Sequence, residues 1–567
     1  MKTVLKYVKP YLPTVVFCVL LKTLAAFTEL AIPRMLAKII DESVPAKDMD
    51  SVLLNGGIMI MFAILTLILN LCGNRISAVA SGKIAFDLRE DLFDKTVRLD
   101  TSATDKIGLS SLTSRLTSDT YNITHFLTRL MRVGLKAPLM LIGGVVITLT
   151  IDTRLALVLI CTLPLVCFTV YGITSRTIPL YREEQQILDS LVRRVDETHS
   201  GIRVIKALSK TEYEKDKFHK TSTALSKKEI EAGMLMSATK PITDLLLNLG
   251  FCFVILVGAL LAKRDGFDAA GALLAFMTYF TIILNNMIMM TRIFVQMSRS
   301  FASAGRVEEI LLASSEMPLC DIEKKEDEPY IVFDNVSFSY NKKIPNVENL
   351  SFSVKKGSTL GIIGATGAGK STILNLLMRL YDVDQGSVRI DGKDVRSIPK
   401  SELHSMFGVA LQNDFIFGGS IEDNVSFFRE GDLDSALSIA CADGFVNALE
   451  DKGAHILTGK GTNVSGGQRQ RLLVARAVYG SPEILVLDDS SSALDYKTDF
   501  ELRRNINKEV RSTTIIVAQR ISSIKNADHI LVIDDGRIIG SGTHDHLMQT
   551  CREYKDIAAV QMGGVEE

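Results

Sequence analysis

The chain has no surplus of charge of either sign. Its 64 lysine and arginine residues and 65 aspartate and glutamate residues give a formal net charge of -1 at pH 7. Proteins that bind nucleic acid do so largely through its phosphates and carry a positive excess for that purpose. We therefore expect no nucleic-acid partner.

Paired cysteines and a cleavable leader are also missing. The eight cysteines are scattered, without the spacing of disulfide pairs or metal ligands. They are expected to act as small, mostly buried side chains in a reducing or lipid setting. The first residues, MKTVLKYVKPYL, are not followed by a short apolar core with a small-residue cleavage site. We therefore expect no signal peptide and a cytoplasmic N-terminus.

What the chain has in excess is apolar sequence. It is 47% hydrophobic with a mean hydropathy of +0.22, and the excess lies in the first 300 residues. A bilayer is crossed by about 20 apolar residues. Six runs of that length lie near 12–40, 52–76, 130–151, 154–175, 242–263 and 267–296. Lysine and arginine favour the long connections 77–129 and 176–241, which predicts that these connections are cytoplasmic.

Glu29 places an ionisable group inside the first of these runs. Such a group is costly in a membrane and usually faces protein or a water-filled cavity. Lys22 lies seven positions earlier, about 10 Å along a helix axis, which is long for a direct ion pair. Two interpretations stay open: Glu29 bonds a neighbouring helix, or it lines a substrate pathway.

The second half of the chain contains a phosphate-binding pattern. LGIIGATGAGKSTILNLL has the order strand, glycine-rich turn, helix, and Gly364, Gly369, Lys370 and Ser371 satisfy the P-loop motif in full. Backbone N–H groups of such a loop surround phosphates, and the helix N-terminus adds a positive dipole end. Lys370 is expected at the β- and γ-phosphates and Ser371 at Mg²⁺. Asp488, at the end of the apolar run EILVLD, supplies a second Mg²⁺ contact through water.

Three further segments narrow the class. They are VALQNDFIF with Gln412, NVSGGQRQRLLVARA with Ser465 and Gly467, and SALD at 492–495. With these motifs the chain resembles the ATP-binding cassette (ABC) transporters over essentially its whole length. The resemblance identifies Gln412 as the Q-loop glutamine, Ser465 and Gly467 as signature residues, and Tyr340 in VSFSY as the aromatic that stacks on adenine.

The order of the two halves resembles that of half-transporter exporters, whose two chains swap helices and close on two ATP molecules. Segments near 110–120 and 200–218 resemble the coupling regions that dock onto the cassettes. The resemblance implies ATP and Mg²⁺ as cofactors, with Mg²⁺ held by Ser371, Gln412 and Asp488. It assigns ATP binding to Tyr340, Gly364, Thr366, Gly367, Ala368, Gly369, Lys370, Ser371, Thr372, Gln412 and Asp488.

Two positions of the catalytic site depart from the family pattern. Cassettes that hydrolyse ATP carry glutamate where this chain has Asp489, and histidine where it has Gln519. The shorter carboxylate stands about 1–1.5 Å further from the attacking water, and a misplacement of that order costs about 10²-fold in rate. Glutamine can bond a phosphate but cannot carry the charge of imidazole. Either change alone is compatible with drift, but both together predict a degenerate catalytic site.

The sequence therefore predicts a multidomain membrane protein. Its six-helix transmembrane domain of ABC exporter type covers 1–315, a linker covers 316–329, and an α/β P-loop nucleotide-binding domain covers 330–567. The chain is interpreted as one subunit of a heterodimeric exporter in the cell membrane, with a cytoplasmic nucleotide-binding domain. Ser465 and Gly467 would complete the catalytic site of a second half-transporter.

The substrate stays open among drug-like amphiphiles, lipids and peptides, and membrane lipid is an expected partner. One alternative is a homodimeric exporter that hydrolyses ATP slowly through Asp489. Another is an ATP-gated regulator or channel that transports nothing.

Overall fold

The computed structural model describes residues 2–265, 270–313, 317–412, 414–490 and 492–562. The chain forms two compact units. The membrane unit comprises Met1–Val97 and Gly108–Ala313, and the nucleotide unit comprises Arg98–Ile107 and Ser314–Glu567.

Six helices of the membrane unit are long and apolar enough to span a bilayer, which confirms the number expected. They run through Thr3–Ser43, Met49–Arg98, Leu109–Ile151, Thr153–Ser200, Thr211–Leu260 and Ala270–Met290. Their central elements are α2 (Leu12–Lys38), α3 (Met49–Arg98), α7 (Lys136–Ile151), α8 (Thr153–Ser200), α11 (Thr239–Asp265) and α12 (Ala270–Leu312). The start of the sixth expected run, 267–269, lies outside the described residues. The protein is thus a multi-pass membrane protein.

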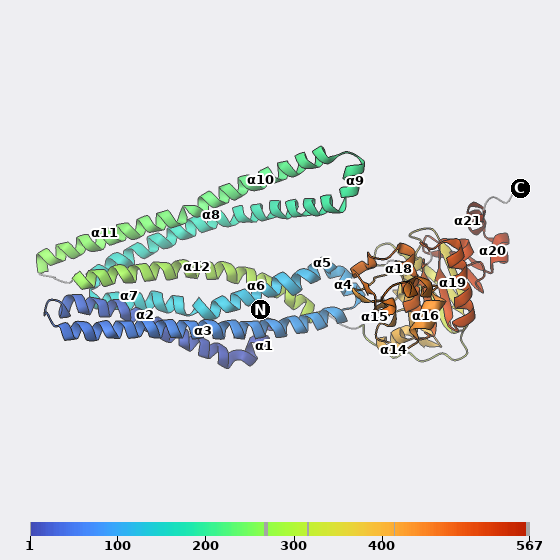
Figure 1. Ribbon diagram of the computed structural model, residues 1–567, viewed down its shortest axis with the longest axis horizontal. Coiled ribbons are helices and arrows are strands. Elements are labelled where there is room, and N and C mark those ends of the chain that lie inside the picture. The colour runs from blue at the N-terminus through green and yellow to red at the C-terminus, as the bar shows by residue number, and fades with distance from the viewer. Residues whose placement is uncertain (1, 266–269, 314–316, 413, 491, 563–567) are drawn as a thin grey trace. The chain divides into compact units, whose positions relative to one another are not determined.

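Shorter segments complete this unit. They are α1 (Lys2–Val8), η1 (Lys9–Tyr11), η2 (Ile39–Ser43), α5 (Leu109–Ser114), η3 (Arg115–Asp119), α6 (Thr120–Arg129), η4 (Leu130–Gly134), α9 (Ile202–Ala207) and α10 (Thr211–Ser237). Figure 1 shows α8 and α10 running side by side, with α9 between them at the tip. Of the residues of α10, Leu225 and Ala232 are buried. Apolar side chains such as Ile230 and Met234 are exposed, as expected of a surface that contacts lipid or another chain.

The nucleotide unit contains two larger sheets and a short one. The four-stranded sheet is antiparallel, in the order β2-β1-β4-β5, and the six-stranded sheet has the order β12-β11-β3-β10-β9-β6. The strands are β1 (Ile331–Phe338), β2 (Val347–Val354), β3 (Thr359–Gly364), β4 (Gln385–Ile390), β5 (Lys393–Asp394), β6 (Phe407–Ala410), β9 (Ile484–Asp488), β10 (Thr513–Val517), β11 (His529–Asp534) and β12 (Arg537–Gly542). The third sheet pairs β7 (Gly419–Ser420) with β8 (Ile456–Leu457).

The core of this unit lies on the six-stranded sheet. Its central strands are parallel, and β9 is buried at every residue, which explains its continuous apolar sequence. The helices are α13 (Lys370–Leu377), α14 (Lys400–Ser405), α15 (Ile421–Ser426), α16 (Leu433–Ile439), α17 (Asp443–Asn447), α18 (Gly466–Val478), α19 (Tyr496–Glu509), α20 (His544–Thr550) and α21 (Arg552–Met562). Single turns of 3-10 helix are η5 (Val395–Ser397), η6 (Lys452–Ala454), η7 (Gly459–Gly461) and η8 (Ile521–Ser523).

One segment from the first half of the chain belongs to the nucleotide unit. It contains α4 (Thr101–Ile107), whose first turn is capped by the Asp100 carboxylate, which accepts from the Ala103 N–H. The stretch near 110–120, expected as a docking segment, forms α5 and η3 of the membrane unit, and its docking role stays a prediction. Both stretches are polar and rich in serine and threonine, so their composition does not separate them. The segment 200–218 remains a prediction.

Candidate nucleotide-binding site

The sheet order brings the predicted nucleotide residues to one edge. Strands β3, β10, β9 and β6 are parallel neighbours, so their carboxyl ends lie side by side. The P-loop follows β3, Gln519 follows β10, Asp488 ends β9, and Gln412 follows β6. The carboxyl edge of a parallel sheet is where ligands bind in open α/β folds. Four segments far apart in sequence thus meet at one site.

The P-loop backbone depends on its glycines. Gly367 and Gly369 have φ of +87° and +100°, in the left-handed region that side chains disfavour. A Cβ on Gly364 would lie 2.0 Å from the Ile533 carbonyl oxygen, so only glycine fits between β3 and β11. Thr366 and Ala368 lie in the same turn, and α13 begins directly after it. The loop therefore presents backbone N–H groups at a helix N-terminus, a geometry that binds phosphate.

We predict that Gly364→Ala destabilises the nucleotide unit and weakens ATP binding. The added Cβ forces the end of β3 away from Ile533, and such overpacking typically costs about 1–3 kcal/mol. Gly444→Ala is the matched control, because no atom lies within 4 Å of a Cβ placed there. Thermal unfolding and ATP titration of the two variants measure the difference. Equal unfolding temperatures and ATP affinities would contradict the packing argument.

Three side chains surround the place where phosphates and a cation would bind. The Lys370 ammonium donates to the carbonyl oxygens of Gly364 at 2.9 Å and Ala365 at 2.7 Å. The Ser371 hydroxyl donates to the Asp488 carboxylate at 2.9 Å, and Asp488 is 4% exposed. A hydroxyl and a carboxylate in contact are oxygen ligands of the kind that Mg²⁺ takes together with substrate phosphates. The residues present therefore fit the ion.

Asp489 and Gln519, the two catalytic-site positions that depart from the family pattern, are in contact. The Asp489 Oδ2 accepts from the Gln519 amide at 3.1 Å and from the Gln412 amide at 3.5 Å. Its backbone N–H donates to the Val517 carbonyl, and its φ of +48° is one that aspartate tolerates better than most residues. The structure thus places Asp489, Gln519 and Gln412 in one cluster beside Asp488.

Burial is the largest cause of the pKa shifts in this cluster. It raises the pKa of Asp488, and the neighbouring Asp489 raises it further, whereas Ser371 and Lys370 oppose the shift. Burial likewise raises the pKa of Asp489, against Lys370, Arg520 and the Gln412 hydrogen bond. Burial lowers the pKa of Lys370. A divalent cation would offset the repulsion between the two carboxylates.

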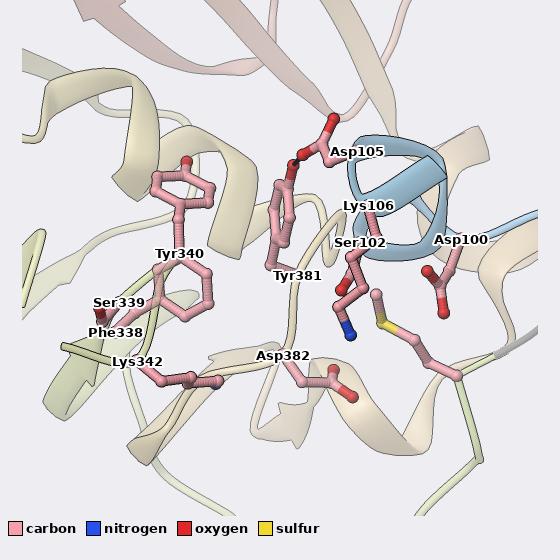
Figure 2. Close-up of a pocket in the computed structure, with 11 residues that line it drawn as sticks. Asp100, Ser102, Asp105, Lys106, Phe338, Ser339, Tyr340, Lys342, Tyr381 and Asp382 are labelled. Carbon is pink, nitrogen blue, oxygen red and sulfur yellow. Dashed lines mark hydrogen bonds between the residues drawn. The ribbon is translucent and has the colours of Figure 1, made fainter. Parts of the chain in front are cut away.

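Tyr340 lies beside the start of α13. Its hydroxyl accepts from the Asn375 amide at 3.0 Å and lies 3.4 Å from the Thr372 hydroxyl. The ring meets Tyr381 edge to face, with centroids 5.0 Å apart, and lines a cavity of about 430 Å³ (Figure 2). Tyr340 thus places an aromatic ring beside α13, the helix that follows the phosphate loop, whereas the residues that line this cavity include none of the P-loop.

The cavity is also lined by residues that the sequence did not identify as functional. The Tyr381 hydroxyl donates to the carboxylate of Asp105 in α4, and Figure 2 shows the two side chains pointing toward each other. These partners are 276 positions apart, and neither belongs to a motif. A tyrosine shortly after the P-loop helix was the only available signal. The contact joins α4 to the ring that packs against Tyr340.

Ser465 and Gly467 lie at the N-terminus of α18. The Ser465 hydroxyl accepts from the Gln468 N–H, and the Gln468 side chain accepts from the Ser465 N–H, forming a capping box. One turn later, the Gln470 amide donates to the Ser492 hydroxyl at 2.9 Å and accepts from the Ala493 N–H at 2.8 Å. The signature helix is thereby tied to the segment that follows Asp489.

Glu29 of α2 is paired within the membrane unit. Its carboxylate accepts from the Lys136 ammonium at 2.7 Å, and Lys136 belongs to α7. The Lys22 ammonium instead donates to Asn70 and Asn74 of α3, in keeping with the separation expected along α2. The bond to a neighbouring helix is thus present, and the substrate-pathway role of Glu29 stays a prediction.

Comparison with known families supports this organisation. A model described as the ABC transporter transmembrane region matches residues 15–287, and a model described as ABC transporter matches residues 347–492. The chain is 32% identical to an uncharacterized ABC transporter ATP-binding protein of Mycobacterium tuberculosis, over 99% of both chains.

Further similarities concern one more relative and one solved structure. A fatty acid ABC transporter ATP-binding/permease protein of Mycobacterium bovis is 31% identical over 81% of this chain and 74% of its own. A bacterial Atm1-family ABC exporter solved with ATP bound has a similar fold, with a TM-score of 0.80. That similarity covers 98% of this chain and 99% of the exporter at 22% identity.

Proposed function

The chain belongs to the ABC transporter family as an exporter half-transporter with a fused ATPase domain, and from that premise we propose that it is the degenerate-site subunit of a heterodimer. Exporters of this family work as dimers and hydrolyse ATP to move a substrate across the membrane. The observation that carries the proposal is the cluster of Asp489 with Gln519 and Gln412 beside an intact P-loop.

This cluster is suited to holding ATP and poorly suited to splitting it. The Asp489 carboxylate is engaged by two amide groups, and neither glutamine supplies a charged imidazole. General-base catalysis needs the base within hydrogen-bond reach of the attacking water, and the short Asp489 side chain stands back from it. The P-loop, Tyr340 and Asp488 keep the groups that binding requires. Binding without rapid hydrolysis follows.

The binding roles proposed for the chain's own residues follow from their positions. Lys370 holds the β- and γ-phosphates, the backbone of 366–369 surrounds them, and Tyr340 stacks on the base. Ser371, Asp488 and Gln412 would hold Mg²⁺, which would supply positive charge beside the transferred phosphoryl group. Ser465 and Gly467 address the phosphates of the ATP bound to the other subunit. Closure on both nucleotides reorients the membrane halves, and hydrolysis at the other site resets them.

The proposed cargo is an amphiphile: a drug-like compound, a lipid or a peptide. The relative from Mycobacterium bovis is named a fatty acid transporter, and fatty acids are amphiphiles. The proposed orientation has the N-terminus and the nucleotide unit in the cytoplasm, because lysine and arginine favour the connections on that side.

Co-purification with tagged neighbouring gene products, followed by ATPase and vesicle transport assays, tests this function. The heterodimer predicts that the pair hydrolyses ATP and transports, whereas the single chain does neither at a comparable rate. Vectorial transport by the purified single chain would instead establish the homodimer that works through Asp489. Nucleotide-dependent gating without any vectorial transport would establish the regulator.

A further inference from the structure

A cluster of cationic side chains lies inside the membrane unit. Lys22 of α2 is 4% exposed, and its ammonium donates to Asn70 O at 3.2 Å, Asn70 Oδ1 at 3.0 Å and Asn74 Oδ1 at 2.9 Å. All three acceptors are neutral. A Cβ on Gly73 would lie 2.9 Å from the Lys22 Cε, so the glycine leaves room for the lysine stem. The buried lysine is thus built into the contact between α2 and α3.

A second cation reaches the same asparagine from another helix. Arg132 of η4 donates from Nη2 to the Asn74 carbonyl oxygen at 3.3 Å. Its Nε is buried and has no hydrogen-bond partner in the described part of the chain. Residues Leu130–Gly134 form a π-helical turn, a local irregularity that often marks functional positions. The protein itself therefore leaves one donor of Arg132 unsatisfied.

The charges of the cluster do not balance. Lys136, one turn after Arg132, pairs with Glu29 at 2.7 Å. Within the described residues, Glu29 is the one carboxylate that forms an ion pair with any of the three cations, which leaves two positive charges in excess. Unpaired charge in a low-dielectric setting is costly unless an opposite charge approaches it. An anion beside the more exposed Nη2 of Arg132 would offset the excess charge.

We propose that Arg132 and Lys136 bind the anionic headgroup of the transported amphiphile, with Lys22 behind them holding Asn74 in place. The shared chemistry is a carboxylate or phosphate attached to an apolar chain, since both accept hydrogen bonds from guanidinium and ammonium groups. Apolar side chains such as Leu20, Phe27 and Leu71 are exposed on α2 and α3 and suit the apolar tail of the amphiphile. This inference rests on the proposed amphiphile export and narrows its substrate class.

Glu29 has a defined role in this arrangement. Its carboxylate competes with the headgroup for Lys136, because an ammonium shared between two anions binds each less strongly. Removing the Glu29 charge therefore strengthens headgroup binding, whereas removing the Arg132 charge weakens it. A purely structural cluster gives no such opposite signs, since each substitution would disturb packing alone.

The test measures equilibrium binding to the full chain, assembled with its dimer partner in phosphatidylcholine nanodiscs, with empty nanodiscs subtracted. Four labelled probes share one C18 chain: oleate, oleyl phosphate, oleyl alcohol and oleylamine. A pH of about 8.5 keeps the carboxylate ionised despite burial. We expect oleate or oleyl phosphate to bind about tenfold or more tightly than oleyl alcohol. The ratio of the two anions tells carboxylate from phosphate as the natural headgroup.

Substitutions in the cluster test whether these residues form the binding site. Arg132→Gln should weaken binding of the preferred anion about tenfold, and Glu29→Gln should tighten it several-fold, with oleyl alcohol affinity serving as the measure of intact folding. Lys240→Gln is the charge-matched control, because Lys240 is exposed and pairs with Asp244 outside the cluster.

Equal or tighter binding of oleyl alcohol or oleylamine would overturn the anionic assignment and leave amphiphile export standing. Unchanged anion affinity in both cluster variants would overturn the site. Binding of none of the four probes would remove the amphiphile class as well.

Discussion

Ser465→Ala is expected to lower ATP turnover of the assembled complex about 10²-fold, although we propose that this chain's own catalytic site is degenerate. In the closed dimer of this family, each signature faces the ATP held by the opposite P-loop. Ser465 caps α18, so its hydroxyl and the first N–H groups lie at the positive end of the helix dipole, which favours phosphate charge. Removing one preorganised donor at such a site typically costs about 10²–10³-fold. ATPase activity of the complex with a wild-type partner is the measurement.

Two comparisons make this result specific. Ser420→Ala removes an equivalent capping box from α15 and should cost a similar cap energy, about 1 kcal/mol, without slowing turnover. Lys370→Ala empties the site that turns over least, so it should reduce hydrolysis less than Ser465→Ala does. Loss of turnover in Lys370→Ala together with near wild-type turnover in Ser465→Ala would show that the sites are not divided as proposed.

Replacing Asp489 by Glu together with Gln519 by His is expected to raise hydrolysis at this chain's own site about tenfold or more. The longer carboxylate recovers about 1–1.5 Å of reach toward the water, and a displacement of that size is worth about 10²-fold. Imidazole restores a group that can be charged beside the γ-phosphate. The measurement uses a complex in which the other subunit's P-loop lysine is replaced, so that the remaining turnover comes from this site.

The single variants serve as controls for this gain. Asp489→Glu alone leaves the glutamine in place and should give a smaller increase. Asp489→Asn removes the carboxylate that Gln412 and Gln519 contact and should abolish the residual activity. If Asp489→Asn hydrolysed ATP as fast as the double variant, neither position would limit the rate.

The clustering of the candidate nucleotide residues was predictable because each belongs to a short, local pattern. The glycine spacing indicates the P-loop, and the apolar run before Asp488 indicates a buried strand that ends at this residue. Their convergence follows from one rule of parallel sheets, since β3, β10, β9 and β6 end at the same edge. The hydrogen bonds from both glutamines to Asp489 were not predictable, because they depend on side-chain reach across neighbouring strands.

The membrane unit was predictable to a coarser level. Hydropathy identifies six spans because burial in lipid constrains composition over about 20 residues at a time. It does not reveal which helices touch, so the pairing of Glu29 with Lys136 and of Lys22 with Asn70 and Asn74 came from the structure. The attachment of α4 to the nucleotide unit was not predictable for the same reason, because it depends on tertiary contacts such as that between Asp105 and Tyr381.

Nucleotide retention tests the asymmetry of the two sites most directly. The complex is loaded with radiolabelled ATP and Mg²⁺, chased with excess unlabelled ATP through many turnovers, and then separated from free nucleotide for analysis. We expect the label to remain bound as unhydrolysed ATP, and Lys370→Ala to abolish this retained fraction. Release of the label within the time of a single turnover, or its recovery as ADP, would contradict a site that holds ATP without splitting it.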